Sequence, residues 1–362
     1  HEPHSAYFHP SGANAMHIAG DVFSGTFASG GHGGMMFFYY EPRQVAANPK
    51  LWERVAGHIS ALRERGASRL PPFDLAIYLP CNADRFGGRS FGSYPHMGMC
   101  LAWEALHRER LLPGILTRLA PSEACSGLKL VCVEDCGVMS QEEIERLVRH
   151  VREGGRLFLA SEEGRRLLDD PEADFALLRA LGFPENHGLD YAAKGRAEIA
   201  LRPPFFTDRK TLHLRTDAPT ADIVLPEGAE VLGTFADGRP GVVKWSLGQG
   251  EVVVVLGRLR SYLQPGEGSF LADLRRWTGI ARPNLSVTPN DRRVFASVSE
   301  RDGIYYLEAF RSGPRTYNRH MVGVRPDEPD EPLDVRIGLP RVAEGSYHVR
   351  RIGVGAKDLG VK

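Results

Sequence analysis

The segment LKLVCVEDCGVMSQEEIERLVRHVREGGRLFLAS, residues 128–161, decides the fold of the chain's middle. Its residues 128–133 and 156–160 are mostly apolar and have the length of strands. A helix is predicted between them, because Ser140 and Glu143 have the spacing of a capping box. The apolar residues after the box recur at helical intervals: Ile144, Leu147, Val148 and Val151. Residues 128–160 therefore predict a complete βαβ unit of a parallel sheet.

Further strands extend this unit in both directions. Residues 75–79 predict a first strand, and three more are predicted near the other end, at 230–235, 241–245 and 251–256, where glycine and proline supply the turns. Strands that alternate with amphipathic helices and finish in a hairpin layer indicate an α/β domain. We predict a flavodoxin-like domain, of the class I glutamine amidotransferase-like type, over residues 71–282.

The two flanks differ from this domain in composition. Residues 35–40 are apolar, lie between glycines and Pro42, and predict a buried strand. A helix is expected next, capped by Asn48 and ended by Gly66. Beyond residue 283 the short β-rich segments indicate a small antiparallel β-sandwich: residues 293–297, 304–310 and 347–352. The expected domains are residues 1–70, 71–282 and 283–362.

Charge and cysteine usage narrow the class of protein. The chain has 362 residues with 45 acidic and 45 basic side chains, so no net charge favours nucleic acid or an anionic membrane as partner. No apolar run approaches the roughly 20 residues that cross a bilayer, and no signal peptide is recognisable. The five cysteines form no CxxC pair, which favours free thiols and a cytoplasmic location. The start at His1 indicates a piece of a longer polypeptide.

The middle domain offers no recognisable catalytic residue. The segment LPCNADRFGGRSFG, residues 79–92, contains no GxGxxG or GxxxxGK motif, so no nucleotide or flavin cofactor is expected. An amidotransferase-like hydrolase needs a nucleophilic cysteine on the turn after a strand, and that turn carries Ser161 instead. Arg258 stands where a histidine base would be needed. Cys136 is interpreted as a buried apolar residue, while Ser161 with Glu162 remains an alternative catalytic pair.

Two phrases, ACSGLKLVCVEDCGVMSQEEIERLVRHVREGGRLFLAS at 124–161 and ADGRPGVVKWSLGQGEVVVVLGRL at 236–259, resemble the trimerisation domain of β-galactosidases in glycoside hydrolase family 42. The resemblance implies a degenerate amidotransferase-like domain without an active site, and a homotrimer. It also implies that the end of a (β/α)8 barrel precedes this domain and that a small β domain follows it. FASGGHGGMMFFYYEP, residues 27–42, would then be the eighth barrel strand, and residues 48–66 its helix.

The resemblance also implies a carbohydrate site. Retaining glycosidases use two carboxylates about 5 Å apart, and the acid/base of this family lies on the fourth barrel strand, upstream of His1. Glu2 precedes Gly30 by 28 residues, close to the interval implied for the nucleophile. Tyr40, with Tyr39 and Glu41, takes the place of the family's sugar-stacking tryptophan, a departure that leaves the sugar open. His4, with His9, His17 and His32, is expected at the same barrel mouth, without a metal because the spacing is irregular.

Three functional hypotheses follow. In the first, the chain is the C-terminal part of a retaining, β-galactosidase-like glycoside hydrolase that is inactive without an upstream barrel segment. In the second, it is a non-catalytic assembly or carbohydrate-binding module. In the third, Ser161 makes the middle domain a hydrolase. Seven upstream β/α repeats with a glutamate on the fourth strand would favour the first hypothesis. A native start codon just before His1 would favour the second, and serine-directed labelling at Ser161 the third.

Overall fold

The computed structural model forms two compact units, one of residues 73–282 and the other of residues 1–72 with 283–362. The units are described separately below. The structure describes residues 50–66, 74–78, 111, 113–118, 120, 122–133, 136–170, 172–185, 188–189, 195–207, 211–214, 217–219, 221–257, 268–280, 285–288, 294–311, 315–318, 321–324, 336–339, 345–346, 348–351 and 357–361.

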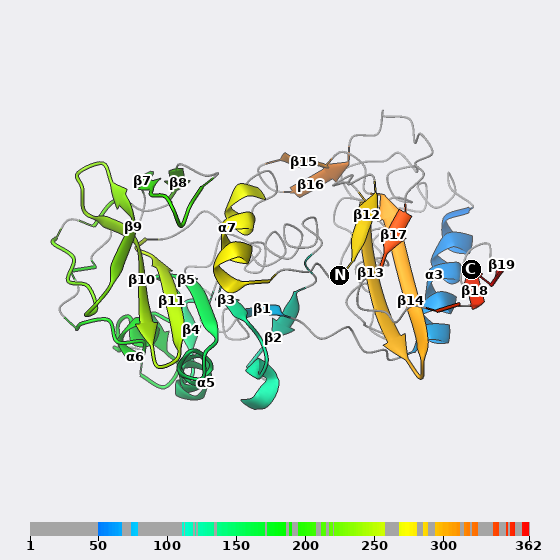
Figure 1. The fold of residues 1–362 in the computed structure, drawn as a ribbon, viewed down its shortest axis with the longest axis horizontal. Coiled ribbons are helices and arrows are strands. Elements are labelled where there is room, and N and C mark those ends of the chain that lie inside the picture. Colours follow the sequence, from blue (N-terminus) through cyan, green and yellow to red (C-terminus); the bar gives the residue numbers. More distant parts are fainter. Residues whose placement is uncertain are drawn as a thin grey trace. The chain divides into compact units, whose positions relative to one another are not determined.

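The unit of residues 73–282 contains a nine-stranded mixed sheet, seen in Figure 1. Its strand order is β2-β1-β3-β5-β11-β10-β9-β7-β8. The first five strands are parallel to one another: β2 (Gly114–Leu116), β1 (Leu75–Tyr78), β3 (Leu130–Val133), β5 (Arg156–Ala160) and β11 (Gly250–Val255). The other four continue the sheet in antiparallel fashion: β10 (Pro240–Leu247), β9 (Glu230–Phe235), β7 (Glu198–Leu201) and β8 (Thr211–His213).

The βαβ unit predicted from residues 128–160 is confirmed. α5 (Gln141–Arg152) begins with the expected capping box, in which Ser140 Oγ accepts from the Glu143 amide at 3.3 Å and Glu143 Oε2 accepts from the Ser140 amide at 2.7 Å. The apolar stripe of the helix is buried, as its spacing predicted. The sequence placed residues 251–256 in a terminal hairpin layer. The structure corrects this detail, because β11 also pairs in parallel with β5 and completes the parallel half of the sheet.

Both faces of the sheet are covered, which explains why its central strands are apolar throughout. Val253 and Val255 of β11 belong to one core cluster, whereas Val252 and Val254 belong to the other, as the two-residue period of a strand requires. α5 and α6 (Ala176–Ala180) contribute to the second cluster. α7 (Gly268–Thr278) contributes Leu274 to the first. The polar ends of the strands are therefore the places left for chemistry.

Three short elements complete this unit. η2 (Ser122–Cys125) is a turn of 3-10 helix before β3. β4 (Val138–Met139) and β6 (Arg166–Leu167) form a small parallel pair outside the main sheet. The Gly164 amide donates to the Cys136 carbonyl at 2.6 Å beside this pair, so the turn after β5 is held against the segment that leads into α5.

The other unit joins α3 (Lys50–Arg65), the helix expected from residues 48–66, to antiparallel strand pairs. β13 (Val294–Arg301) and β14 (Ile304–Arg311) form the longest pair. The remaining pairs are β12 (Ser286–Thr288) with β17 (Arg336–Gly338), β15 (Arg315–Asn318) with β16 (Met321–Val324), and β18 (His348–Arg351) with β19 (Lys357–Val361).

α3 buries Ala61 and Arg65, one turn apart, and leaves Ile59 37% exposed. The expected strand at residues 35–40 lies outside the described residues. Among the helices that the structure describes, none is both long and apolar enough to span a membrane.

Candidate functional site

The residues predicted to bind and cleave a carbohydrate all lie outside the described part of the chain: Glu2, His4, Tyr39, Tyr40 and Glu41. The same holds for Arg258 and for the other histidines of the predicted barrel mouth, His9, His17 and His32. The structure therefore tests the middle of the chain, where sequence reasoning expected no chemistry. Two regions of the large sheet bear on whether this part has a site: the carboxyl ends of its parallel strands, and the opposite ends, where β5 and β11 begin.

The carboxyl ends of β1 and β3 form the place where α/β sheets usually bind ligands. The chain crosses from β1 to β2 on one side and returns to β3 on the other, so the strand order reverses here. Tyr78, the last residue of β1, donates from its hydroxyl to Glu143 Oε1 at 2.7 Å. Both side chains are buried. The position is thus occupied by the protein's own side chains.

The electrostatics of this pair keep it inert. Burial, and then the hydrogen bond to Glu143, raise the pKa of the Tyr78 hydroxyl far above its usual value. The phenol therefore stays protonated and serves as a donor. One carboxylate oxygen of Glu143 accepts a hydrogen bond from Tyr78, and the other accepts one from the Ser140 amide. Sequence reasoning recognised only its capping role, because the partner is 65 residues away.

The turn after β5 carries Ser161, the residue of the alternative hydrolase hypothesis. Its side chain is fully buried, and its Oγ accepts from the Gly257 amide at 2.9 Å. The Ser161 amide donates to the Val255 carbonyl at 2.9 Å, so the residue ties the ends of β5 and β11 together. A buried hydroxyl in this position serves the backbone and does not face a substrate.

Glu162 and Cys136 do not supply a catalytic partner there. Glu162 accepts from Arg165 Nη1 at 3.0 Å, and Arg165 also donates from Nε to Asp174 Oδ1 at 2.6 Å. Burial alone would raise the pKa of Asp174, but the hydrogen bond and charge of Arg165 hold it below its usual value. Cys136 is fully buried, as predicted, and its amide donates to Glu163.

The cysteines that the structure describes are free thiols. Cys125, Cys132 and Cys136 are all buried, and burial raises the pKa of the Cys125 thiol. Cys81 and Cys100 lie outside the described residues. Within the described ranges, no group of three or more histidine, cysteine or acidic side chains is arranged to hold a metal ion.

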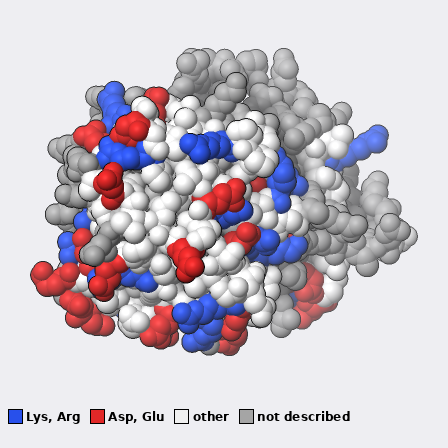
Figure 2. Space-filling view, turned by 60° about the vertical axis from the view of Figure 1, so that its left-hand side comes forward, with Lys and Arg blue, Asp and Glu red and all other residues white. Residues whose placement is uncertain are grey.

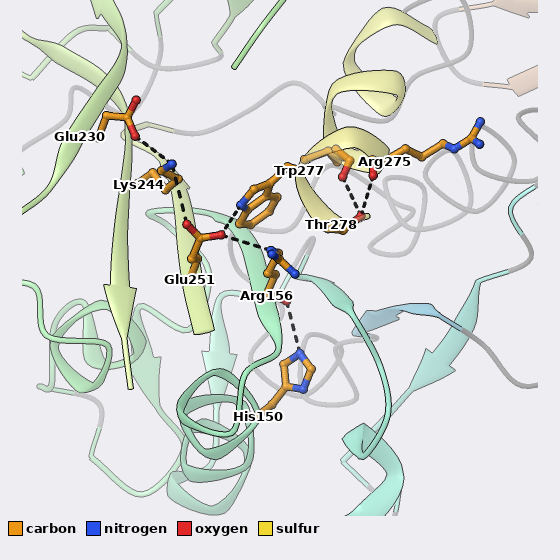
Figure 3. Close-up of polar contacts among 9 residues, drawn as sticks. His150, Arg156, Glu230, Lys244, Glu251, Arg275, Trp277 and Thr278 are labelled. Atoms are coloured by element: carbon orange, nitrogen blue, oxygen red, sulfur yellow. Dashed lines mark hydrogen bonds and ion pairs between the residues drawn. The ribbon is translucent and has the colours of Figure 1, made fainter. Parts of the chain in front are cut away.

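The opposite edge of the sheet, where β5 and β11 begin, carries a polar network that the sequence did not reveal (Figure 3). Glu251 Oε2 accepts from Arg156 Nε at 3.2 Å and from Trp277 Nε1 at 2.8 Å. Its Oε1 lies 3.8 Å from Lys244 Nζ, which in turn lies 2.8 Å from Glu230 Oε2. Both oxygens of Glu251 have partners, and the network joins β5, β9, β10, β11 and α7.

His150 lies next to this network, in the last turn of α5 (Figure 3). The ring is buried, and its Nε2 lies 3.3 Å from the carbonyl oxygen of Arg156. Burial lowers the pKa of His150, against the opposing effect of hydrogen bonds to the Arg156 and Cys125 carbonyls and of the nearby Glu153 carboxylate. The imidazole is therefore neutral in the folded protein over a wider pH range than in the unfolded chain.

We expect the free energy of unfolding to decrease as the pH falls below 6.5, the ordinary pKa of histidine. A lowered pKa in the folded state means that the unfolded chain binds more protons, so the stabilisation is complete above pH 6.5 and is lost on acidification towards the folded-state pKa. Urea unfolding between pH 7.5 and 5.5 measures this slope. His150→Gln should flatten it, and an unchanged slope in that variant would assign the effect to other groups.

The face drawn in Figure 2 carries charges of both signs. On the face drawn in Figure 2, positive and negative side chains lie interspersed among uncharged ones, without one extended patch of a single sign. This mixture agrees with the equal numbers of acidic and basic residues in the chain. A face of this kind lacks the field that steers polyanions towards a binding site.

The fold resembles part of several solved glycoside hydrolase structures. A β-galactosidase from Bacillus circulans sp. alkalophilus matches 75% of the chain with a TM-score of 0.53 and 18% identity. A β-galactosidase of family 42 from G. stearothermophilus matches 80% with a TM-score of 0.56 and 18% identity. An α-L-fucosidase, isoenzyme 2 from Paenibacillus thiaminolyticus, matches 98% with a TM-score of 0.59 and 14% identity. No family model and no curated protein sequence matches the chain.

These likenesses establish a fold similar to that of the family 42 β-galactosidases in the part compared. The chain spans 39% and 44% of the length of the two β-galactosidases and 56% of that of the fucosidase. Each of these enzymes is thus much longer than the segment it shares with this chain. The fold, and the hydrogen bonds made by Tyr78, Glu143 and Ser161 at the carboxyl ends of the described strands, are the two findings on which a function can be built.

Proposed function

We propose that this chain is the C-terminal part of a retaining glycoside hydrolase similar to the β-galactosidases of family 42. The observation that carries the proposal is the fold likeness over 75% and 80% of the chain to two β-galactosidases, each more than twice as long as the matched segment. The phrases at 124–161 and 236–259 point to the same family. In this proposal the missing length is the upstream part of the barrel.

The middle unit serves assembly in this proposal. Its parallel strands run in the order β2-β1-β3-β5-β11, the order of a flavodoxin-like sheet, and this supports the amidotransferase-like assignment. The Tyr78–Glu143 hydrogen bond and the buried Ser161 hydroxyl occupy the positions where such a domain would hold a ligand or a nucleophile. A domain closed in this way is free to act as the contact between subunits of a homotrimer, and the C-terminal strand pairs form the small β-sandwich.

The catalytic contribution of the chain comes from the segment before α3. Glu2 is the proposed nucleophile: its carboxylate attacks the anomeric carbon while the upstream acid/base protonates the leaving glycosidic oxygen. Water, deprotonated by the same upstream group, then cleaves the glycosyl ester and restores Glu2. Tyr39 and Tyr40 offer aromatic faces to the sugar, and Glu41 and His4 offer hydrogen bonds to its hydroxyl groups.

The protein with its complete barrel is expected to hydrolyse aryl β-galactosides and to have the mass of a trimer in solution. Release of the aryl alcohol measures the first property, and light scattering coupled to size exclusion measures the second. An active but strictly monomeric protein would contradict the assembly role of the middle unit. A trimer without activity on any aryl glycoside would contradict the enzyme and favour the non-catalytic module.

A further inference from the structure

The end of α3 is held by a residue from the opposite end of the chain. Arg301 Nη1 donates a hydrogen bond to the main-chain carbonyl of Arg65, the last residue of the helix, across 236 positions of sequence. Figure 1 draws α3 beside the β13–β14 hairpin whose tip carries Arg301. Arg65 is completely buried, so water does not reach this carbonyl in its place. A carbonyl left without a donor in such a position is costly.

The position suits a guanidinium on electrostatic grounds as well. The last carbonyls of a helix have no partner within the helix, and they carry the negative end of its dipole. A cation placed there is stabilised by both effects. The helix also ends in Gly66 with φ +65°, the left-handed conformation that terminates many helices. An added Cβ at Gly66 would meet Arg301 Nη1, so the guanidinium lies directly against this glycine.

The hairpin tip is built to hold Arg301 in place. Asp302 and Gly303 both have positive φ, at 54° and 77°, and they form the two-residue turn between β13 and β14. Glu300 Oε1 accepts from the Gly303 amide at 2.7 Å, which fixes the turn from the preceding strand. Arg301 pairs with Ile304 across the hairpin. The guanidinium is therefore carried by the last residue of β13, next to a turn held by the Glu300–Gly303 hydrogen bond.

We propose that the β13–β14 hairpin is a lock for α3, in which Arg301 caps the C-terminal end of the helix. The C-terminal strands then support the N-terminal helix, and in the sequence residues 73–282 lie between the helix and the arginine that caps it. This arrangement explains why residues 1–72 and 283–362 form one compact unit although they are far apart in the sequence. The inference concerns the local stability of α3 and does not depend on the glycosidase activity.

Hydrogen exchange of the full chain tests the lock. Arg301→Ala should accelerate amide exchange in residues 62–66 by about 10- to 100-fold, the size of effect expected from one lost hydrogen bond with a charged donor. Exchange in α5 should not change. Arg301→Lys keeps the charge and a donor and should restore most of the protection, whereas Gly66→Ala should displace the guanidinium and imitate Arg301→Ala.

Arg63→Ala is the matched control, because it removes an exposed arginine from the same helical turn and leaves the Arg301 hydrogen bond intact. It should leave the exchange of residues 62–66 within about a factor of three of the original, as expected for a surface substitution. Unchanged protection in Arg301→Ala would overturn the lock. Equal acceleration in Arg63→Ala and Arg301→Ala would also overturn it, because helix charge alone would then explain the effect.

Discussion

Replacing Phe158 by alanine is expected to lower the free energy of unfolding of the unit of residues 73–282 by about 3–5 kcal/mol. Phe158 lies in the middle of β5, between Cys132 of β3 and Val253 of β11, and its side chain is completely buried. The neighbouring strands are held by ladder hydrogen bonds on both sides, so they cannot close the cavity that alanine leaves. Urea unfolding followed by circular dichroism measures the loss.

Phe158→Leu is the control for this substitution. Leucine keeps most of the volume and should cost less than about 1.5 kcal/mol. A loss below about 1 kcal/mol in Phe158→Ala would contradict the central position of β5, because a partly exposed edge strand would tolerate the substitution. The two variants together separate the effect of the cavity from that of the changed residue type.

Replacing Glu2 by glutamine in the protein with its complete barrel is expected to lower kcat/KM for an aryl β-galactoside by at least about 10⁴-fold, the size of effect seen when an essential group of a catalytic set is removed. An amide cannot attack the anomeric carbon to form the glycosyl ester, so both steps of the retaining reaction fail. KM should change much less than kcat, because glutamine keeps the size and polarity of the side chain.

Glu145→Gln is the matched control, because Glu145 is an exposed residue of α5 that accepts a hydrogen bond from Gln141. This substitution should leave kcat/KM unchanged. Activity close to that of the original protein in Glu2→Gln would exclude Glu2 as the nucleophile and assign that role to another carboxylate.

The parts of the fold predicted from the sequence are those with strong local signals. The capping box at Ser140 and the stripe after it determine α5 almost without help from the rest of the chain. β7 and α7 were not predicted from the sequence. In the case of β7, no strong local signal marks the strand. β7 has four residues, of which Ile199 and Leu201 are buried, and its register depends on pairing with β9, more than 25 residues further along the chain. Pairing between distant segments of this kind leaves no periodic pattern in a short strand.

In the candidate site, too, features with a local sequence signal were predicted and features that depend on distant residues were not. The absence of a cysteine from the turn after β5 could be read from the sequence, because the motif for that turn is local, but the burial of the Ser161 hydroxyl could not. The closure of the strand ends by Tyr78 and Glu143 could not, since each residue has an ordinary local role at the end of a strand or in a helix cap. Arg301 is a further example, because its partner is a main-chain carbonyl that carries no signal in the sequence.

Trapping of the covalent intermediate tests the central claim most directly, namely that the chemistry of this protein comes from the segment before α3 and not from the unit of residues 73–282. A fluorinated galactoside that forms the glycosyl ester but releases it slowly should add one sugar to the full-length protein. Mass spectrometry of the peptides should find that sugar on Glu2. A sugar on any residue between 73 and 282, or on a carboxylate other than Glu2, would contradict the account.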